Sequence, residues 1–344
     1  MRRRIKCVVW DLDDTLWQGT LLEGDIPVLK PRVRSVICAL DDRGILQSVA
    51  SKNDFAAAWD RLVAFGLHDY FLHPQIGWAS KSDSLRIIAE RLGIAIEAVA
   101  LVDDQPFELD EVRFYLPEVM TIDGADVDKL LHLSALQPPF VTNESKLRRH
   151  MYQTDIRRKQ DEEEFDGTRE EFLSTLAMVV TIRVAGEQDL RRAEELTIRT
   201  NQLNTTGRTY SYAELHALLH SHNHLLLVAE LTDRYGTSGT IGLALIERGA
   251  DDWLVKLLIT SCRVISRGVG GIMLGHILRS AKNAGARLRV EFVPNSHNRI
   301  MYVTYKFNDF FEVSEQGGVI VLEHPLDTIR PLPPYITVNV PDEH

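Results

Sequence analysis

The chain has 344 residues, of which 44% are hydrophobic, and a formal net charge of -10. This length predicts two or three domains with ample material for packed cores. The acidic balance disfavours nonspecific nucleic-acid binding. A basic cluster at residues 2–4 precedes an apolar run, residues 5–10, that is too short for a signal-peptide core or a membrane span. We therefore expect a cytoplasmic protein with neither nucleic acid nor membrane as a partner. Three widely spaced cysteines indicate neither a disulfide framework nor a zinc site.

The first part of the chain alternates between strand and helix patterns. Strands are predicted at residues 5–10, 45–50, 71–76, 98–102 and, as an edge strand, 119–122. Helices are predicted at residues 31–42, up to Gly66, at 83–92 and from Pro106. This alternation predicts an α/β fold with a doubly wound parallel sheet. The irregular stretch 17–30 is expected to form a flap.

Polar side chains follow three of these strands. They are Asp11 and Asp13, then Ser51, then Asp103 and Asp104. Because the carboxyl ends of parallel strands meet at one edge of a sheet, we expect these residues to lie together, with Lys81 before a nearby helix. Asp11, Asp103 and the backbone carbonyl of Asp13 are hard oxygen ligands that suit Mg²⁺. The Ser51 hydroxyl and the Lys81 ammonium suit phosphate oxygens.

The order Asp11-x-Asp13-x-Thr15, Ser51, Lys81 and Asp103-Asp104 resembles the motifs of the haloacid dehalogenase-like superfamily, over residues 5–125. The resemblance implies that Asp11 attacks phosphorus and that Asp13 acts as general acid and then base. It also implies metal ligation by Asp11, Asp13 and Asp103. The implied phosphate-binding residues are Thr15, Ser51, Lys52, Asn53 and Lys81. Residues 14–50 leave no room for a large cap domain, so the site would admit a substrate presented by a protein.

A Pro-rich break at residues 137–139 and a charged stretch at 143–176 predict a solvated helical connector. We therefore assign residues 1–136 to a phosphatase-like domain, 137–176 to a connector and 177–344 to a second domain.

The second domain is predicted to be mixed α/β. Strands are expected at 179–184, 225–231, 239–247, 253–262 and 288–293, and helices at 187–200, 272–284 and 298–305. Residues 199–206 are rich in amides and hydroxyls and suggest a binding wall. A glycine-rich turn at 267–271 lies between a strand and a helix, where backbone amides can bind phosphate.

This order resembles the GNAT acyltransferase fold over about residues 177–325. Arg267-x-x-Gly270 matches the start of its pyrophosphate signature, and Asn298 and Tyr305 fall at its later motif. Ile272 departs from the signature, which has a small residue there, and this disfavours ordinary acetyl-CoA binding. A pantetheine arm would depend less on that turn.

Cys262 lies on the strand that hosts the acyl group in the GNAT fold. It is a candidate nucleophile or a packed core residue, and Arg263 and Arg267 would lower its pKa. Cys7 is predicted to be buried in a strand and inert, but a role for it in carrying the acyl group stays open. Cys38 falls on an apolar helix face.

Over nearly the whole chain, these motifs resemble the FkbH-like family, a subclass IIIC haloacid dehalogenase-like domain fused to a GNAT-like domain. The resemblance also rests on Arg199-Thr200-Asn201-Gln202-x-Asn204 and Ser261-Cys262-Arg263-Val264. It implies transfer of a glyceryl unit from 1,3-bisphosphoglycerate to an acyl carrier protein, with removal of the remaining phosphate, for polyketide biosynthesis. The implied acyl- and pantetheine-binding residues are Asn201, Gln202, Asn204, Arg263, Arg267, Gly268, Gly270 and Asn298.

Two other functions stay open. One is a Mg²⁺-dependent phosphatase fused to a CoA-dependent N-acetyltransferase. The other is a noncatalytic docking module for a carrier protein, against which the intact set of Asp11, Asp13, Ser51, Lys81 and Asp103 argues.

Overall fold

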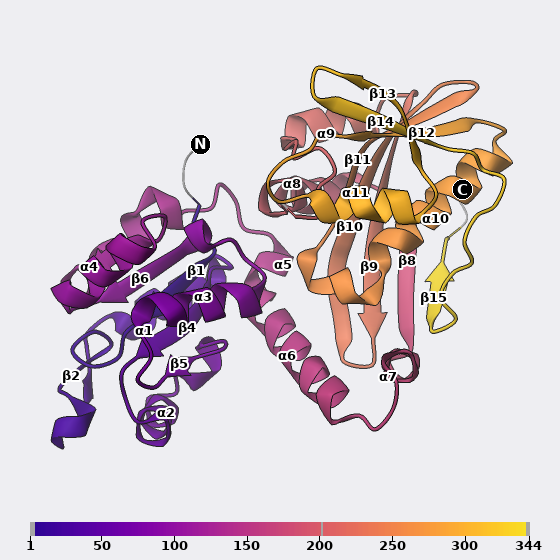
Figure 1. Cartoon of the computed structure of the whole chain (residues 1–344). Helices are drawn as coiled ribbons and strands as arrows, with labels where there is room; N and C mark the ends of the chain where they lie inside the picture. The colour runs from indigo at the N-terminus through magenta and orange to yellow at the C-terminus, as the bar shows by residue number, and fades with distance from the viewer. Residues whose placement is uncertain (1–3, 201, 342–344) are drawn as a thin grey trace. The chain divides into compact units, whose positions relative to one another are not determined.

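The computed structural model describes residues 4–200 and 202–341 (Figure 1). The chain forms two compact units, Met1–Arg157 and Arg158–His344. The boundary falls within α6 (Arg148–Glu164), one of the helices of the charged stretch together with α5 (Asn143–Lys146) and α7 (Arg169–Thr175). Among the described residues, no helix has the length and apolar character needed to cross a membrane.

The first unit is built on a five-stranded sheet. Its strands run in the order β5 (Gln75–Ile76), β4 (Leu46–Ser51), β1 (Cys7–Trp10), β6 (Val99–Asp103) and β7 (Met120–Asp123). Every neighbouring pair is parallel, so the predicted doubly wound parallel sheet is confirmed. The strand predicted at 71–76 is shortened to β5, because His73 has a positive φ of 50° and Pro74 follows it.

Helices cover both faces of this sheet. Val8 and Trp10 pack toward α1 (Val33–Asp42) and α2 (Phe55–Ala64), whereas Cys7 and Val9 pack toward α3 (Lys81–Leu92) and α4 (Pro106–Tyr115). This alternation along β1 is the period of two that a strand buried on both faces requires. Short 3-10 helices lie at Leu21–Glu23, His68–Tyr70, Ile96–Ala98, Gly124–His132 and Ser134–Leu136. The predicted flap contains the antiparallel pair β2 (Trp17–Gln18) and β3 (Val28–Leu29).

The second unit has an eight-stranded sheet. Its order is β13 (Phe311–Gln316), β14 (Val319–His324), β12 (Arg287–Phe292), β11 (Asp252–Thr260), β10 (Gly236–Arg248), β9 (His224–Asp233), β8 (Met178–Val184) and β15 (Ile336–Asn339). Only β11–β12 and β8–β15 pair in parallel. One face packs against α7, α10 (Val269–Asn283) and α11 (Arg299–Phe307), and the other against α8 (Leu190–Arg199) and α9 (Tyr212–Leu219). The predicted mixed α/β class is confirmed.

Strands β11 and β12 diverge within this sheet. Their pairing runs only from Asp252 to Val255 on β11, although the strand continues to Thr260. Beyond the divergence, the Thr205 amide donates to the Leu258 carbonyl at 3.2 Å, and the Thr260 amide donates to the Leu203 carbonyl at 3.2 Å. The chain's own backbone at residues 203–205 therefore pairs with this part of β11.

The strand predicted at 253–262 is too long at its carboxyl end. It stops at Thr260, and Cys262 begins a 3-10 helix, Cys262–Arg267. The turn starts there because the Val264 amide donates back to the Ser261 carbonyl at 3.1 Å. Cys262 therefore follows the strand rather than lying on it. The helix predicted from residue 272 begins earlier, at Val269.

Candidate functional site

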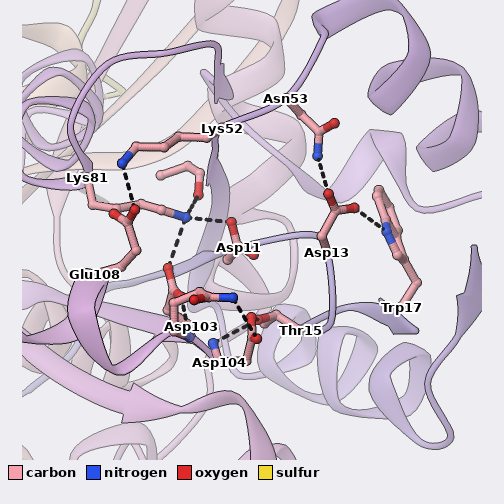
Figure 2. Close-up of polar contacts among 12 residues, drawn as sticks. Asp11, Asp13, Thr15, Trp17, Lys52, Asn53, Lys81, Asp103, Asp104 and Glu108 are labelled. Carbon is pink, nitrogen blue, oxygen red and sulfur yellow. Dashed lines mark hydrogen bonds and ion pairs between the residues drawn. The ribbon is translucent and has the colours of Figure 1, made fainter. Parts of the chain in front are cut away.

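The three predicted strand ends meet at one edge of the first sheet. Asp11 follows β1, Ser51 ends β4 and Asp103 ends β6, and β1 lies between the other two strands. Lys81 begins α3, whose start is fixed by Ser80, since the Ser80 hydroxyl accepts a hydrogen bond from the Asp83 amide at 3.1 Å. Figure 2 shows the Lys81 ammonium between Asp11 and Asp103.

Lys81 is the cationic centre of this edge. Its side chain is buried. The ammonium donates a hydrogen bond to Asp11 Oδ1 and another, of 2.7 Å, to the Ala50 carbonyl. It also lies 2.9 Å from Asp103 Oδ2. Burial alone would lower the pKa of Lys81, but the charges of Asp11 and Asp103 outweigh it and raise that pKa. Lys81 therefore stays protonated and offsets part of the charge of both carboxylates.

Burial has the opposite effect on the two carboxylates. It is the largest cause that raises the pKa of Asp11 to about 6, against the lowering effect of Lys81. Burial likewise raises the pKa of Asp103. One lysine thus leaves the two buried acids only partly compensated, which favours a further cation at the site.

Asp13 is oriented away from Lys81. Its Oδ1 accepts hydrogen bonds from the Trp17 indole at 2.7 Å and the Leu21 amide at 3.3 Å. Its Oδ2 accepts one from the Asn53 side chain at 2.9 Å (Figure 2). These bonds hold the Asp13 carboxylate in a single orientation beside Asp11. The sequence pattern did not predict this contact of Trp17, which follows Asp13 by four residues.

The other predicted phosphate-binding residues have protein partners. The Thr15 hydroxyl donates to Asp104 Oδ1 at 2.9 Å and accepts from the Asp104 amide at 3.0 Å. Lys52 forms an ion pair with Glu108 at 2.6 Å. Asn53 holds Asp13, while Ser51 is buried at the end of its strand. Glu108 was missed, because only the folded chain brings α4 beside Lys52.

The carboxylates fit a divalent cation. One oxygen each from Asp11, Asp103 and Asp104 can be chosen so that all lie within 4.8 Å of one another. An all-oxygen donor set suits Mg²⁺. For Asp13, the atom predicted to bind the metal is its backbone carbonyl oxygen. Its side chain is held by Trp17 and Asn53, which leaves its backbone carbonyl as the atom for a metal.

Two residues predicted at the acyl site, Asn204 and Asn298, form hydrogen bonds where β11 and β12 diverge. The Asn298 side chain is buried and donates to the carbonyls of Asn204 and Val293 at 3.1 and 2.9 Å. Asn204 is also buried, and its Oδ1 accepts from the Gly207 amide at 2.9 Å. Gln202 lies exposed in the preceding turn, and Asn201 lies outside the described residues.

Arg267 forms part of a buried ionic cluster. Its guanidinium lies 3.3 Å from Asp233 Oδ2, and Arg158 lies 2.9 Å from the same oxygen. Arg267 also donates to the Ser238 hydroxyl at 3.3 Å, and Arg263 donates to the Ser238 carbonyl at 3.2 Å. Both predicted anion-binding arginines therefore contact the protein itself.

The glycine-rich turn keeps an accessible helix start. Gly268 has a φ of 74° and precedes α10, and no side chain caps the helix. A Cβ placed on Gly268 or Gly271 would meet open space. First-turn amides of this kind bind anions. Ile272 is buried in the core, so its bulk does not narrow this turn.

The three cysteines differ in how far their side chains are buried. Cys7 is fully buried in β1, and burial raises the pKa of its thiol. Cys38 lies on α1, and its Sγ is 3.3 Å from the Tyr70 hydroxyl. Cys262 is half-buried at the carboxyl end of β11. Tyr305 lies fully buried in the core of the second unit, and burial raises the pKa of its hydroxyl.

Comparisons with known proteins found similar solved structures of two kinds. No protein-family model matches the chain, and no curated protein matches it. Among solved structures, it is similar to the N-terminal part of a Bacteroides fragilis protein that contains a phosphatase domain and is complexed with Mg. That likeness has 26% identity and a TM-score of 0.34, and it covers 40% of this chain but only 41% of that one.

The chain is also similar to two acetyltransferases. The Escherichia coli ribosomal-protein-S18-alanine N-acetyltransferase matches with 17% identity and a TM-score of 0.35, over 44% of this chain and 96% of that one. The N-acetyltransferase PaiA of Thermoplasma acidophilum, in complex with coenzyme A, matches with 16% identity and a TM-score of 0.34, over 42% of this chain and 98% of that one. At such scores, none of these likenesses assigns a ligand or a reaction to this chain.

Proposed function

We propose that this protein loads a glyceryl unit from 1,3-bisphosphoglycerate onto an acyl carrier protein and removes the remaining phosphate. The observation that carries the proposal is the meeting of Asp11, Asp13, Lys81 and Asp103 at one sheet edge, in a chain that also holds a half-buried cysteine beside a glycine-rich helix start. The first unit would act on the phosphate ester and the second on the acyl group.

In the first unit, Asp11 would attack the phosphorus of the ester at C3 of the glyceryl unit. The C3 oxygen leaves with a proton from Asp13, and an aspartyl-phosphate forms. Asp13, held by Trp17 and Asn53, then takes a proton from the water that releases phosphate. Lys81 neutralises charge on the transferred group. A Mg²⁺ ion held by Asp11, Asp103 and the Asp13 carbonyl would supply further charge neutralisation.

In the second unit, the Cys262 thiolate would attack C1 of the acyl phosphate. The bond from the carbonyl carbon to the phosphate oxygen breaks, inorganic phosphate leaves and a thioester forms. The thiol of the carrier's phosphopantetheine arm then takes the acyl group and regenerates the Cys262 thiol. The full burial of Cys7 supports Cys262 for this role. The amides at the start of α10 suit the phosphate of the arm.

Exposed apolar side chains around the first site support a substrate carried by a protein. One such side chain lies close in the sequence to each segment that supplies a site residue. They are Ile26 in the flap, Phe55 at the start of α2, Trp78 before Lys81 and Phe107 at the start of α4. They are 80, 50, 72 and 76% exposed, respectively. Exposed apolar side chains on the segments that supply a site are typical of a surface that a partner covers.

A second candidate function keeps one specific observation in its favour. Because Ile272 is buried in the core, the glycine-rich turn is open to the pyrophosphate of acetyl-CoA as well. Calorimetry with acetyl-CoA distinguishes this function, since saturable binding without carrier loading would favour the acetyltransferase.

Intact-mass spectrometry of a carrier protein tests the proposal. The phosphopantetheinylated carrier is incubated with the protein, Mg²⁺ and 1,3-bisphosphoglycerate. A mass gain corresponding to one glyceryl group is expected. No gain with any carrier, together with phosphate release from unrelated esters, would overturn it.

A further inference from the structure

A separate group of metal-ligating side chains lies on the second unit, away from its cysteine and glycine-rich turn in the sequence. Glu187 begins a 3-10 helix, Glu187–Asp189, that leads into α8. His216 lies on α9, and His220 caps the carboxyl end of that helix. The two histidines are four residues apart, so they share one face of the helix.

The distances among these groups match a coordination sphere. Glu187 Oε1 lies 3.5 Å from His216 Nε2 and 3.3 Å from His220 Nε2. One ligand atom from each residue lies within 4.8 Å of the others. Around a tetrahedral Zn²⁺ with bonds of about 2.0–2.1 Å, neighbouring ligand atoms are about 3.3–3.4 Å apart. An ion can therefore enter with only small movements of these side chains.

The side chains are accessible and partly ordered by their surroundings. The Glu187, His216 and His220 side chains are 63, 44 and 56% exposed. The two imidazole rings lie 4.5 Å apart, and the His216 ring also stacks on Tyr212, over which the Arg191 guanidinium lies. This packing limits the rotation of His216, so part of the cost of ordering a ligand is met before an ion binds.

We propose that Glu187, His216 and His220 form a binding site for one Zn²⁺ ion. Two imidazoles and one carboxylate suit zinc, whereas the all-oxygen cluster of the first unit suits magnesium. Three protein ligands leave a fourth position for water or an external ligand. The bound ion would join the start of α8 to the end of α9. Each imidazole would bind the metal through one unprotonated ring nitrogen and keep the N–H of the other nitrogen.

The test measures metal binding to the full chain in the presence of excess Mg²⁺. Calorimetry with Zn²⁺ gives stoichiometry and affinity, and the visible absorption of added Co²⁺ reports tetrahedral coordination. His216→Ala, His220→Ala and Glu187→Gln are compared with His222→Ala. His222 is an exposed neighbour outside the cluster, so its variant controls for a general loss of surface histidine.

We expect one Zn²⁺ per chain, a tetrahedral Co²⁺ spectrum and a higher melting temperature with Zn²⁺. The affinity should fall at least about tenfold in each of the three cluster variants and stay unchanged in His222→Ala. Uptake that survives both histidine substitutions, or no uptake by the wild-type chain, would overturn the proposal. A melting curve of each metal-free variant shows that it is folded. These readouts do not involve carrier loading, so this site and the proposed function fail or stand independently.

Discussion

The two units use the same kinds of polar side chain in different ways. In the first unit, Asp11, Asp103 and Lys81 gather at the open edge of a parallel sheet, where buried charges are only partly compensated. In the second, Asn298 and Arg267 bond to the chain itself and hold the sheet and its ionic cluster together. We therefore place the proposed reaction at the partly compensated charges of this sheet edge, and we assign Asn298 and Arg267 a structural role.

Removal of the metal should give the largest difference between the reactions of the two units. If the carboxylate cluster holds Mg²⁺, EDTA should abolish phosphate release from phosphate esters, because the buried carboxylates lose the cation that offsets their charge. The thioester on Cys262 should still form from 1,3-bisphosphoglycerate, as judged by the intact mass of the protein. Equal loss of both reactions would contradict this division of labour, and added Mg²⁺ should restore phosphate release.

Lys81→Met should lower phosphatase kcat about 10²–10³-fold, since it removes the cation that faces the transferred group. Lys52→Met is the matched control. Lys52 directly follows β4 and pairs with Glu108, so its substitution should lower kcat less than about tenfold. Steady-state kinetics on a small phosphate ester measure both. Similar losses for the two lysines would show that the central position of Lys81 has no special importance.

Arg267→Ala should act on stability rather than on anion binding. It removes one of two buried guanidiniums from Asp233, and we expect a loss of about 3 kcal/mol in the free energy of unfolding. Urea unfolding measures this, with Arg299→Ala on an exposed helix start as control. Unchanged stability with lost carrier loading would instead make Arg267 a ligand for the arm.

Asn298→Ala should have the smallest effect of the series. It removes the side-chain donor to the Asn204 and Val293 carbonyls, which should cost about 2 kcal/mol. Asn223→Ala in an exposed loop should be neutral. The shift in urea midpoint checks both, and a neutral Asn298→Ala would mean that this side chain is not needed to hold the divergence.

The meeting of Asp11, Ser51 and Asp103 at one sheet edge could be predicted because local patterns determine it. Each apolar strand ends at a polar residue, and parallel pairing brings the ends together without further information. Two sets of side-chain contacts could not be predicted, because they depend on side-chain directions after folding. They are the hydrogen bonds of Asp13 with Trp17 and Asn53, and the ion pair of Lys52 with Glu108.

The second unit was harder to predict for the same reason. The strand and helix order followed from periodicity, but the backbone of residues 203–205 pairs with β11 across a large sequence separation. That pairing gives the predicted binding wall a structural role around Asn204. The zinc-type cluster was missed as well, although the spacing of His216 and His220 within one helix was a signal available in the sequence.

In the function that we propose, the second unit transfers the acyl group and the first unit removes the phosphate. The most direct measurement is the intact mass of the carrier after incubation with Asp11→Asn and with Cys262→Ala. Asp11→Asn should load a glyceryl unit that still carries its phosphate, and Cys262→Ala should load nothing. A fully dephosphorylated glyceryl carrier from Asp11→Asn, or undiminished loading by Cys262→Ala, would contradict the account.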